Sequence, residues 1–183
     1  MTVVKTIAKR MTDDAQNPSA ITKPIVLVGP MGVGKTTVGK KLAKVLRVPF
    51  IDTDNLVVAA HGEIPAIFET QGETAFREFE EDAMLQALSS PAVIATGGGA
   101  VLSELTRERL KAATVIYLAS DGRHMGSRLA KGNRPLLKNG LEDWRRIYEQ
   151  RKPIYEAVCD YQVLVSGLSL AASIAKIREL LGV

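Results

Sequence analysis

The chain has 183 residues, of which 46% are hydrophobic and 24% are charged. These are the values of an ordinary globular domain, so they exclude a disordered chain and leave enough apolar residues for a core. The longest apolar runs fall far short of the roughly 18 residues that a membrane-spanning helix needs, and the single cysteine, Cys159, has no partner for an internal disulfide. We therefore expect a cytoplasmic protein without a membrane partner.

The basic balance of the chain leaves two kinds of partner open. The formal net charge is +4 at pH 7, which suits either nucleic acid or a small anionic substrate. Five cationic residues lie between Asp121 and Glu142 without an acidic residue among them: Arg123, Arg128, Lys131, Arg134 and Lys138. Aromatic residues make up only 5% of the chain, whereas nucleic-acid binders usually add stacking aromatic side chains to a basic surface. We expect a small anionic partner and no nucleic acid.

From residue 24 onward, short apolar runs alternate with longer amphipathic segments. The runs predict five strands, at residues 25–28, 48–51, 92–95, 114–119 and 161–165. The amphipathic segments predict helices at residues 35–46, 55–60, 65–88, 103–111, 142–158 and 169–181. This alternation predicts an α/β fold, a three-layer α/β/α sandwich around a five-stranded parallel sheet. Such a sheet binds its ligands at the carboxyl ends of the strands.

The chain is expected to form a single domain over residues 23–183, preceded by a flexible tail over residues 1–22. The helices at about 54–88, which follow the second strand, are expected to bind the substrate. The basic, glycine-containing segment at about 121–140 has the features of a mobile lid that brings cations over a phosphate on closing. Within it, Arg134 can stabilise charge on a phosphoryl group in transfer, and Arg128 can lie against a nucleotide base.

A phosphate-binding loop follows the first predicted strand. Residues 29–36, GPMGVGKT, match the pattern G-x-x-x-x-G-K-[ST] between a strand and a helix. In such a loop the backbone N–H groups converge on phosphate oxygens, the lysine reaches the β and γ phosphates, and the hydroxyl ligates Mg²⁺. The residues expected to bind a nucleoside triphosphate here are Gly32, Val33, Gly34, Lys35, Thr36 and Thr37.

The remaining motifs favour a small kinase among the P-loop proteins. A GTPase normally carries an N-K-x-D motif for the base, and the sequence has none. The run of four apolar residues followed directly by an acid, typical of ATP-driven machines, is also missing. Motor and switch functions are therefore disfavoured.

Two aspartates, Asp52 and Asp54, end the second predicted strand. Residues two apart in an extended segment project to the same side, so both carboxylates can face the phosphate loop. We expect Asp52 to hold Mg²⁺ through water. We expect Asp54 to bind a substrate hydroxyl and to accept its proton. The alternative for Asp54 is an N-cap of the helix that begins at Asn55.

Arg77 and Glu80 lie three residues apart beside the apolar stripe of a predicted helix, where they can pair. A guanidinium held by a carboxylate is a good receptor for a substrate carboxylate, because its paired donors match that planar anion. The alternative is a surface ion pair of little energetic value. From the residues alone, the surface ion pair is the favoured interpretation.

Two further segments complete the set of candidates. Residues 96–100, TGGGA, end the third strand, and their glycines allow close approach of a ligand, although a loose connector is the alternative. Arg151 precedes Pro153 in a predicted helix, where a proline kink suits an arginine turned into a pocket. An arginine facing solvent is equally compatible with that spacing.

Together these motifs resemble the shikimate kinase family, from about residue 24 to the end of the chain. The matching segments, in order, are GPMGVGKTT, FIDTD, GETAFREFE, ATGGGA, NRPLL and RKPIYE. The resemblance implies ATP-dependent phosphorylation of the 3-hydroxyl of shikimate by a P-loop kinase, on the route to chorismate and the aromatic amino acids. Its cofactors are ATP as co-substrate and Mg²⁺. The size and fold of the chain make a monomer the expected state.

The resemblance also implies a role for each matching residue. Lys35 and Thr36 serve phosphate and Mg²⁺, Asp52 serves the metal through water, and Arg128 lies on the adenine side. Shikimate contacts are implied for Asp54, Arg77, Glu80, Gly98, Gly99, Arg134 and Arg151, of which Asp54 and Arg134, with Lys35, are the catalytic residues. The alternatives are a related kinase of gluconate or a nucleoside monophosphate, and a catalytically silent nucleotide-binding protein.

Overall fold

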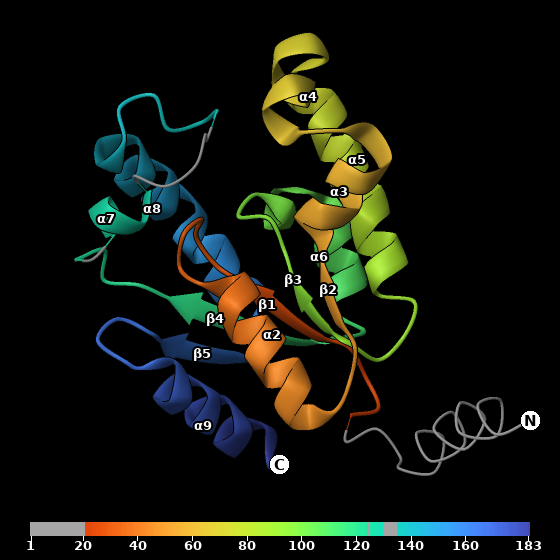
Figure 1. Cartoon of the computed structure of the whole chain (residues 1–183), viewed down its shortest axis with the longest axis vertical. Coiled ribbons are helices and arrows are strands. Elements are labelled where there is room, and N and C mark those ends of the chain that lie inside the picture. Colours follow the sequence, from red (N-terminus) through yellow and green to blue (C-terminus); the bar gives the residue numbers. More distant parts are fainter. Residues whose placement is uncertain (1–20, 124, 130–134) are drawn as a thin grey trace, which may run out of the picture.

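The computed structural model describes residues 21–123, 125–129 and 135–183 (Figure 1). Five parallel strands form one sheet in the order β2-β3-β1-β4-β5. The strands are β1 (Ile25–Val28), β2 (Phe50–Asp52), β3 (Val93–Ala95), β4 (Thr114–Ala119) and β5 (Tyr161–Leu164). In the centre, Val26 of β1 pairs with Ile94 on one side and Val115 on the other. All four residues of β1 are buried, as expected for a strand covered on both faces.

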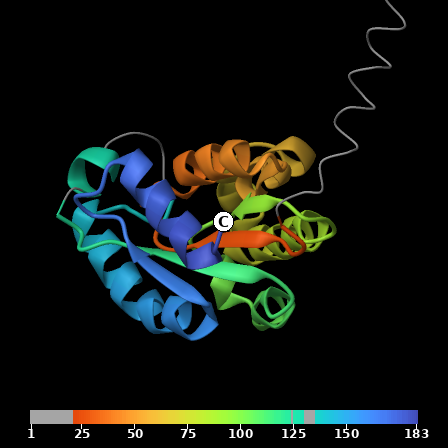
Figure 2. The ribbon, with the colours of Figure 1, turned by 90° about the horizontal axis from the view of Figure 1, so that it is seen from below.

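Helices cover both faces of the sheet, so the predicted three-layer sandwich is confirmed (Figure 2). One face packs against α2 (Lys35–Leu46) and α9 (Leu170–Leu181), and the other against α5 (Gly72–Ala87), α6 (Glu104–Leu110) and α8 (Leu141–Val158). Successive residues of a strand point to opposite faces. Leu27 therefore belongs to the first core, which lies between the sheet and α2 and α9. Val26 belongs to the second core, on the opposite face of the sheet.

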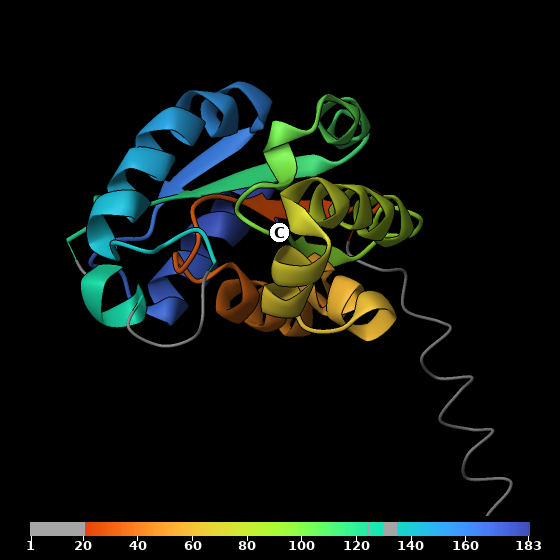
Figure 3. The ribbon, with the colours of Figure 1, turned by 90° about the horizontal axis from the view of Figure 1, so that it is seen from above.

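Shorter helices extend beyond the carboxyl edge of the sheet. The helices α3 (Thr53–His61) and α4 (Ile64–Thr70) pack on α5 around a small core of their own, made of Val57, Ile67, Phe76 and Ala83. The helix α7 (Met125–Leu129) comes after β4. Seen from above, α7 and the α3–α4 pair lie on opposite sides of the loop between β1 and α2 (Figure 3). Within the described part of the chain, no helix is both long and apolar enough to cross a membrane.

Several segments differ from the predicted elements by more than one residue. The helix predicted over residues 65–88 is broken at Gln71, and α5 starts at Gly72, whose φ of +84° favours glycine. The second strand is shifted to Phe50–Asp52, and the helix after it begins at Thr53 rather than Asn55. The lid segment contains α7, which the sequence pattern did not predict because the helix has only five residues. The tail predicted over residues 1–22 falls almost entirely outside the described residues.

Candidate active site

Lys35 lies at the start of α2, at the end of the phosphate-binding loop. Its side chain is buried, and its Nζ donates hydrogen bonds to the carbonyl oxygens of Gly29 at 2.6 Å and Pro30 at 2.9 Å. Burial lowers the pKa of Lys35 from 10.5 to about 8, and the carboxylates of Asp54 and Asp52 oppose that shift. The lysine is therefore mostly protonated at neutral pH, with the carboxylates of Asp54 and Asp52 stabilising its charge.

Asp52 joins the phosphate loop to the helices after β2. Its Oδ2 accepts a hydrogen bond of 2.7 Å from the Thr36 hydroxyl, and its Oδ1 accepts one of 3.1 Å from the backbone N–H of Asp54. Asp52 is thus the N-cap of α3, and the alternative that Asp54 caps this helix is wrong. The premise that both aspartates lie in an extended segment is also wrong, because Asp54 lies in the first turn of α3.

Asp54 nevertheless faces the site. Burial raises its pKa from 3.8 to about 6, and the charges of Glu80 and Asp52 add to that rise while Lys35 and Arg77 oppose it. Its Oδ1 is buried and has no hydrogen-bond partner among the described residues. A buried carboxylate oxygen without a partner is costly, so Asp54 is suited to receive a donor from a ligand.

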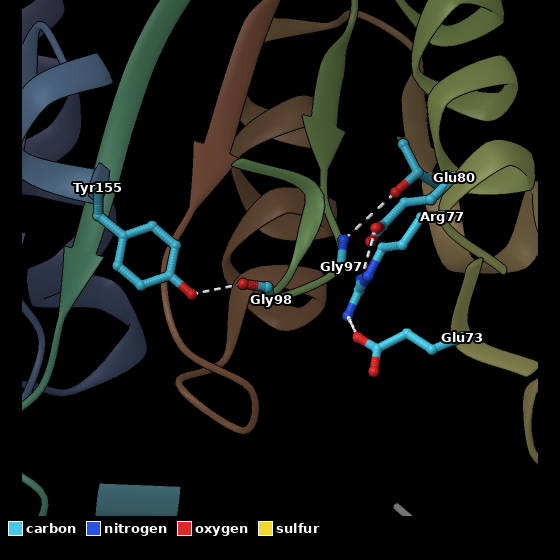
Figure 4. A network of polar contacts seen from close by, with 7 residues as sticks. Glu73, Arg77, Glu80, Gly97, Gly98 and Tyr155 are labelled. Atoms are coloured by element: carbon cyan, nitrogen blue, oxygen red, sulfur yellow. Dashed lines mark hydrogen bonds and ion pairs between the residues drawn. The ribbon is translucent and has the colours of Figure 1, made fainter. Parts of the chain in front are cut away.

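Arg77 is held between two carboxylates of its own helix (Figure 4). Its Nη1 lies 2.7 Å from Glu80 Oε2, and its Nη2 lies 2.8 Å from Glu73 Oε1. The side chains of Arg77 and Glu80 are only 19% and 4% exposed, whereas Glu73 is 49% exposed. Burial raises the pKa of Glu80, and Arg77 opposes that rise. The alternative of a surface ion pair is therefore wrong, because Glu80 lies inside the protein.

The glycine loop, residues 97–99, packs tightly against this pair. A Cβ at Gly97 would collide with the carboxyl group of Glu80, and a Cβ at Gly99 would collide with the guanidinium of Arg77. The Gly97 N–H also donates to the Thr53 hydroxyl at 3.3 Å. Any larger residue would push Arg77 and Glu80 aside, so the loop is a fitted part of the site and not a loose connector.

Two cavities meet at this edge of the sheet. The larger, of about 810 Å³, is lined by the predicted nucleotide-binding residues 32–37 and by Asp52. The smaller, of about 260 Å³, is lined by Arg77, Glu80, Gly99 and Arg151. Arg151 reaches it from α8 and is buried, so an arginine facing solvent is excluded. Met31, Asp54 and Gly98 line both cavities.

Several residues that line the two cavities were not predicted as site residues from the sequence. Val165, Leu168, Leu170 and Ser173, around the start of α9, line the larger cavity. Ile64, Phe68 and Phe76 line the smaller one. Apolar residues in such positions look like ordinary core residues in the sequence, and Val165 and Phe76 are in fact buried, whereas Leu168 and Leu170 are each 38% exposed.

Two predicted residues are not placed by the structure. Arg134 lies outside the described residues. Arg128 belongs to α7, but its side chain also lies outside the description.

The chain is similar to known shikimate kinases over most of its length. The sequence model described as shikimate kinase matches residues 31–181. A shikimate kinase from Thiobacillus denitrificans is 44% identical over 153 residues, which cover 80% of this chain and 84% of that protein. The chain belongs to the shikimate kinase family. A second member, from Streptomyces coelicolor, is 44% identical over 147 residues, covering 78% of this chain and 86% of that protein.

Solved structures agree with the family. The shikimate kinase from Acinetobacter baumannii, solved in complex with shikimate, superposes with a TM-score of 0.84 at 37% identity, covering 89% of this chain and 94% of that one. A gluconokinase from Sinorhizobium meliloti superposes with a TM-score of 0.57 at 19% identity, covering 87% and 95%, which shows the shared fold alone. The resemblance found in the sequence motifs is confirmed. As a shikimate kinase, the chain is an enzyme that uses ATP.

Proposed function

We propose that this shikimate kinase transfers the γ-phosphoryl group of ATP to the 3-hydroxyl of shikimate at the junction of its two cavities. The observation that carries the proposal is the position of Asp54, a carboxylate that lines both cavities. The larger has the phosphate loop that a nucleotide needs. The smaller has the arginines that a carboxylated metabolite needs. A hydroxyl bound beside Asp54 therefore faces the phosphates.

On the nucleotide side, backbone N–H groups of residues 32–37 and the Lys35 ammonium hold the phosphates. Arg128 on the adenine side and Arg134 over the transferring group complete this assignment. The hydroxyl of Thr36 and the carboxylate of Asp52, 2.7 Å apart, are hard oxygen donors that suit Mg²⁺. We propose that Thr36 holds the ion directly and that Asp52 holds it through water. When bound, Mg²⁺ neutralises phosphate charge.

On the acceptor side, Arg77 and Arg151 clamp the carboxylate of shikimate by paired N–H donors. Glu80 holds Arg77 in place, and Gly98 and Gly99 offer backbone groups close to the ligand. Asp54 orients the hydroxyl and accepts its proton as the phosphoryl group moves. Its pKa of about 6 leaves it mostly ionised at neutral pH, as this role requires. Positioning and charge neutralisation then supply most of the catalysis.

We further propose that residues 23–183 form one kinase domain, with acceptor-binding helices at about 54–88 and a lid at about 121–140. The family match over residues 31–181 supports this extent. We expect a cytoplasmic monomer with ATP and shikimate as its small-molecule partners.

A coupled assay of ADP release tests the reaction. The protein is mixed with ATP and Mg²⁺, and shikimate, gluconate and CMP are supplied in parallel wells. We expect ADP release with shikimate alone, and the phosphate of the product on the 3-hydroxyl by ³¹P NMR. Release with gluconate or CMP would reassign the acceptor. No release in any well would favour a silent nucleotide-binding protein.

A further inference from the structure

Tyr155 is a buried tyrosine of α8 that contacts the glycine loop. Its hydroxyl donates a hydrogen bond of 2.5 Å to the carbonyl oxygen of Gly98 (Figure 4). Its ring stacks on Tyr117 of β4, with the ring centres 5.2 Å apart, and it is almost fully buried in the second core. Tyr155 therefore ties the glycine loop to the body of the domain.

The Gly98 hydrogen bond also sets the direction of the next N–H group. The Gly98 carbonyl and the Gly99 N–H belong to one trans peptide unit, in which these two groups point in opposite directions. A carbonyl held by Tyr155 thus turns the Gly99 N–H away from α8. Gly99 lines the smaller cavity and lies against Arg77. The orientation of this peptide therefore affects the acceptor side of the site, where the smaller cavity lies.

The glycine loop also rests on the phosphate loop. A Cβ at Gly98 would lie 3.1 Å from the backbone nitrogen of Met31, so the two backbones are in close contact. The Met31 carbonyl in turn accepts a hydrogen bond of 2.9 Å from the indole Nε1 of Trp144, which is buried. Two loops from different parts of the chain are each fixed to a side chain of α8.

Trp144 and Tyr155 lie on the same side of α8, because eleven residues make close to three helical turns. Tyr148 lies between them. Its ring packs against Trp144 with the centres 5.0 Å apart, and its hydroxyl lies 2.6 Å from that of Tyr117. Trp144 packs on Tyr148 and Tyr155 packs on Tyr117, so both anchoring side chains of α8 are held by ring contacts and fix the two loops relative to the helix.

We propose that Tyr155 and Trp144 are positioning residues, which hold the glycine loop and the phosphate loop at the separation that phosphoryl transfer needs. Tyr155 acts on acceptor binding through Gly98 and through Arg151, one turn earlier on α8, which interacts with the same hydroxyl. Trp144 acts on nucleotide binding through Met31. The assignment of the two sides rests on the proposed function.

The variant Tyr155→Phe keeps the ring and removes only the hydroxyl. We expect the KM for shikimate to rise roughly fivefold, the factor that corresponds to about 1 kcal/mol for one hydrogen bond. The KM for ATP should stay within about twofold of the wild type. Trp144→Phe should show the opposite split, with a higher KM for ATP and an unchanged KM for shikimate. A merely structural role would move both constants together.

Tyr117→Phe is the matched control, because Tyr117 is equally buried and also loses a hydroxyl hydrogen bond, here to Tyr148. It should leave both KM values unchanged even if its melting temperature falls. The inference is overturned if Tyr155→Phe leaves the KM for shikimate unchanged, or if Tyr117→Phe raises it as much. Failure of the proposed function looks different, because the wild type itself would then release no ADP with shikimate.

Discussion

Half of the residues that line the larger cavity form one continuous stretch of chain, residues 31–38, whereas side chains from separate helices and the glycine loop wall the smaller one. The phosphate loop works through backbone N–H groups, which every residue carries, so its geometry depends on local conformation. The acceptor side works through Arg77, Glu80 and Arg151, whose relative positions depend on how α5 and α8 pack. Asp54 belongs to both cavities. Variants should therefore divide into those that affect one side and those that affect the junction.

The largest expected effect is at the junction itself. Asp54→Asn keeps the size of the side chain but loses the carboxylate that accepts the proton, so turnover should fall by about 10²- to 10⁴-fold. The affinity for ATP should change little. The ADP-release assay measures turnover, and the fluorescence of Trp144, which is the only tryptophan of the chain and contacts the phosphate loop, follows nucleotide binding. Turnover equal to that of the wild type would rule out the role of Asp54.

Lys35→Met should damage the nucleotide side alone. It removes a buried cation from the phosphate site, and we expect kcat to fall about 10²-fold, as for the loss of one donor to the transferring group. Shikimate binding, measured directly by calorimetry, should remain near the wild-type value. Weakened shikimate binding in the absence of nucleotide would mean that the two cavities are less separate than their walls suggest.

Arg77→Ala should damage the acceptor side alone. Loss of a charged hydrogen-bond partner predicts a rise of about 10- to 100-fold in the KM for shikimate, with the KM for ATP unchanged. Arg109→Ala is the matched control, because Arg109 donates to the Glu81 carbonyl at 2.9 Å and lines neither cavity. An effect of Arg77→Ala confined to ATP would contradict the placement of this arginine.

The pH dependence links the acceptor side to the junction. Since burial and then the charge of Glu80 raise the pKa of Asp54 to about 6, kcat/KM for shikimate should fall as the pH drops through about 6, where Asp54 becomes protonated. Glu80→Gln removes one cause of the raised pKa, so the fall in kcat/KM should occur at lower pH. Glu73→Gln removes the exposed partner of Arg77 and should leave the pH of this fall unchanged. If kcat/KM falls at the same pH in Glu80→Gln as in the wild type, the charge of Glu80 does not raise the pKa of Asp54.

The smallest effect concerns stability. The pKa of the Asp54 carboxyl rises from 3.8 to about 6 on folding. Above pH 6 this carboxyl is ionised in both states, and the ionised form is less stable in the folded protein than in the unfolded chain, so it lowers the free energy of unfolding. Asp54→Asn should therefore raise the free energy of unfolding at pH 7 by about 1–3 kcal/mol. The gain should fade as the pH falls from 6 toward 3, below the unfolded value of 3.8, where Asp54 is protonated in both states. Urea unfolding at pH 7 and pH 3 measures it, and a loss of stability at pH 7 would contradict a carboxylate that burial destabilises.

The α/β class and the phosphate loop followed directly from the sequence. A continuous apolar run predicts a buried strand, and G-x-x-x-x-G-K-[ST] after it predicts a nucleotide site, because both depend on neighbours in the chain. The predictions that failed in part concern the ends of helices, which also depend on neighbours in the chain. Gly72 breaks a helix that the apolar stripe alone would continue, and α3, capped by Asp52, begins at Thr53, two residues before the pattern suggested. Helix ends depend on individual caps and φ angles, which periodicity does not contain.

Arg77 and Arg151 show the limit of reading the sequence. A surface ion pair and a solvent-facing arginine were open alternatives, because a helical stripe does not show what packs against its polar edge. The tertiary structure decided both by burying Glu80 under the glycine loop and by turning Arg151 into the smaller cavity. The sequence by itself determined the α/β class, the phosphate loop and the family. Only the packing of α5 and α8 against the loops determined the acceptor site, because burial and charge pairing arise between segments far apart in the chain.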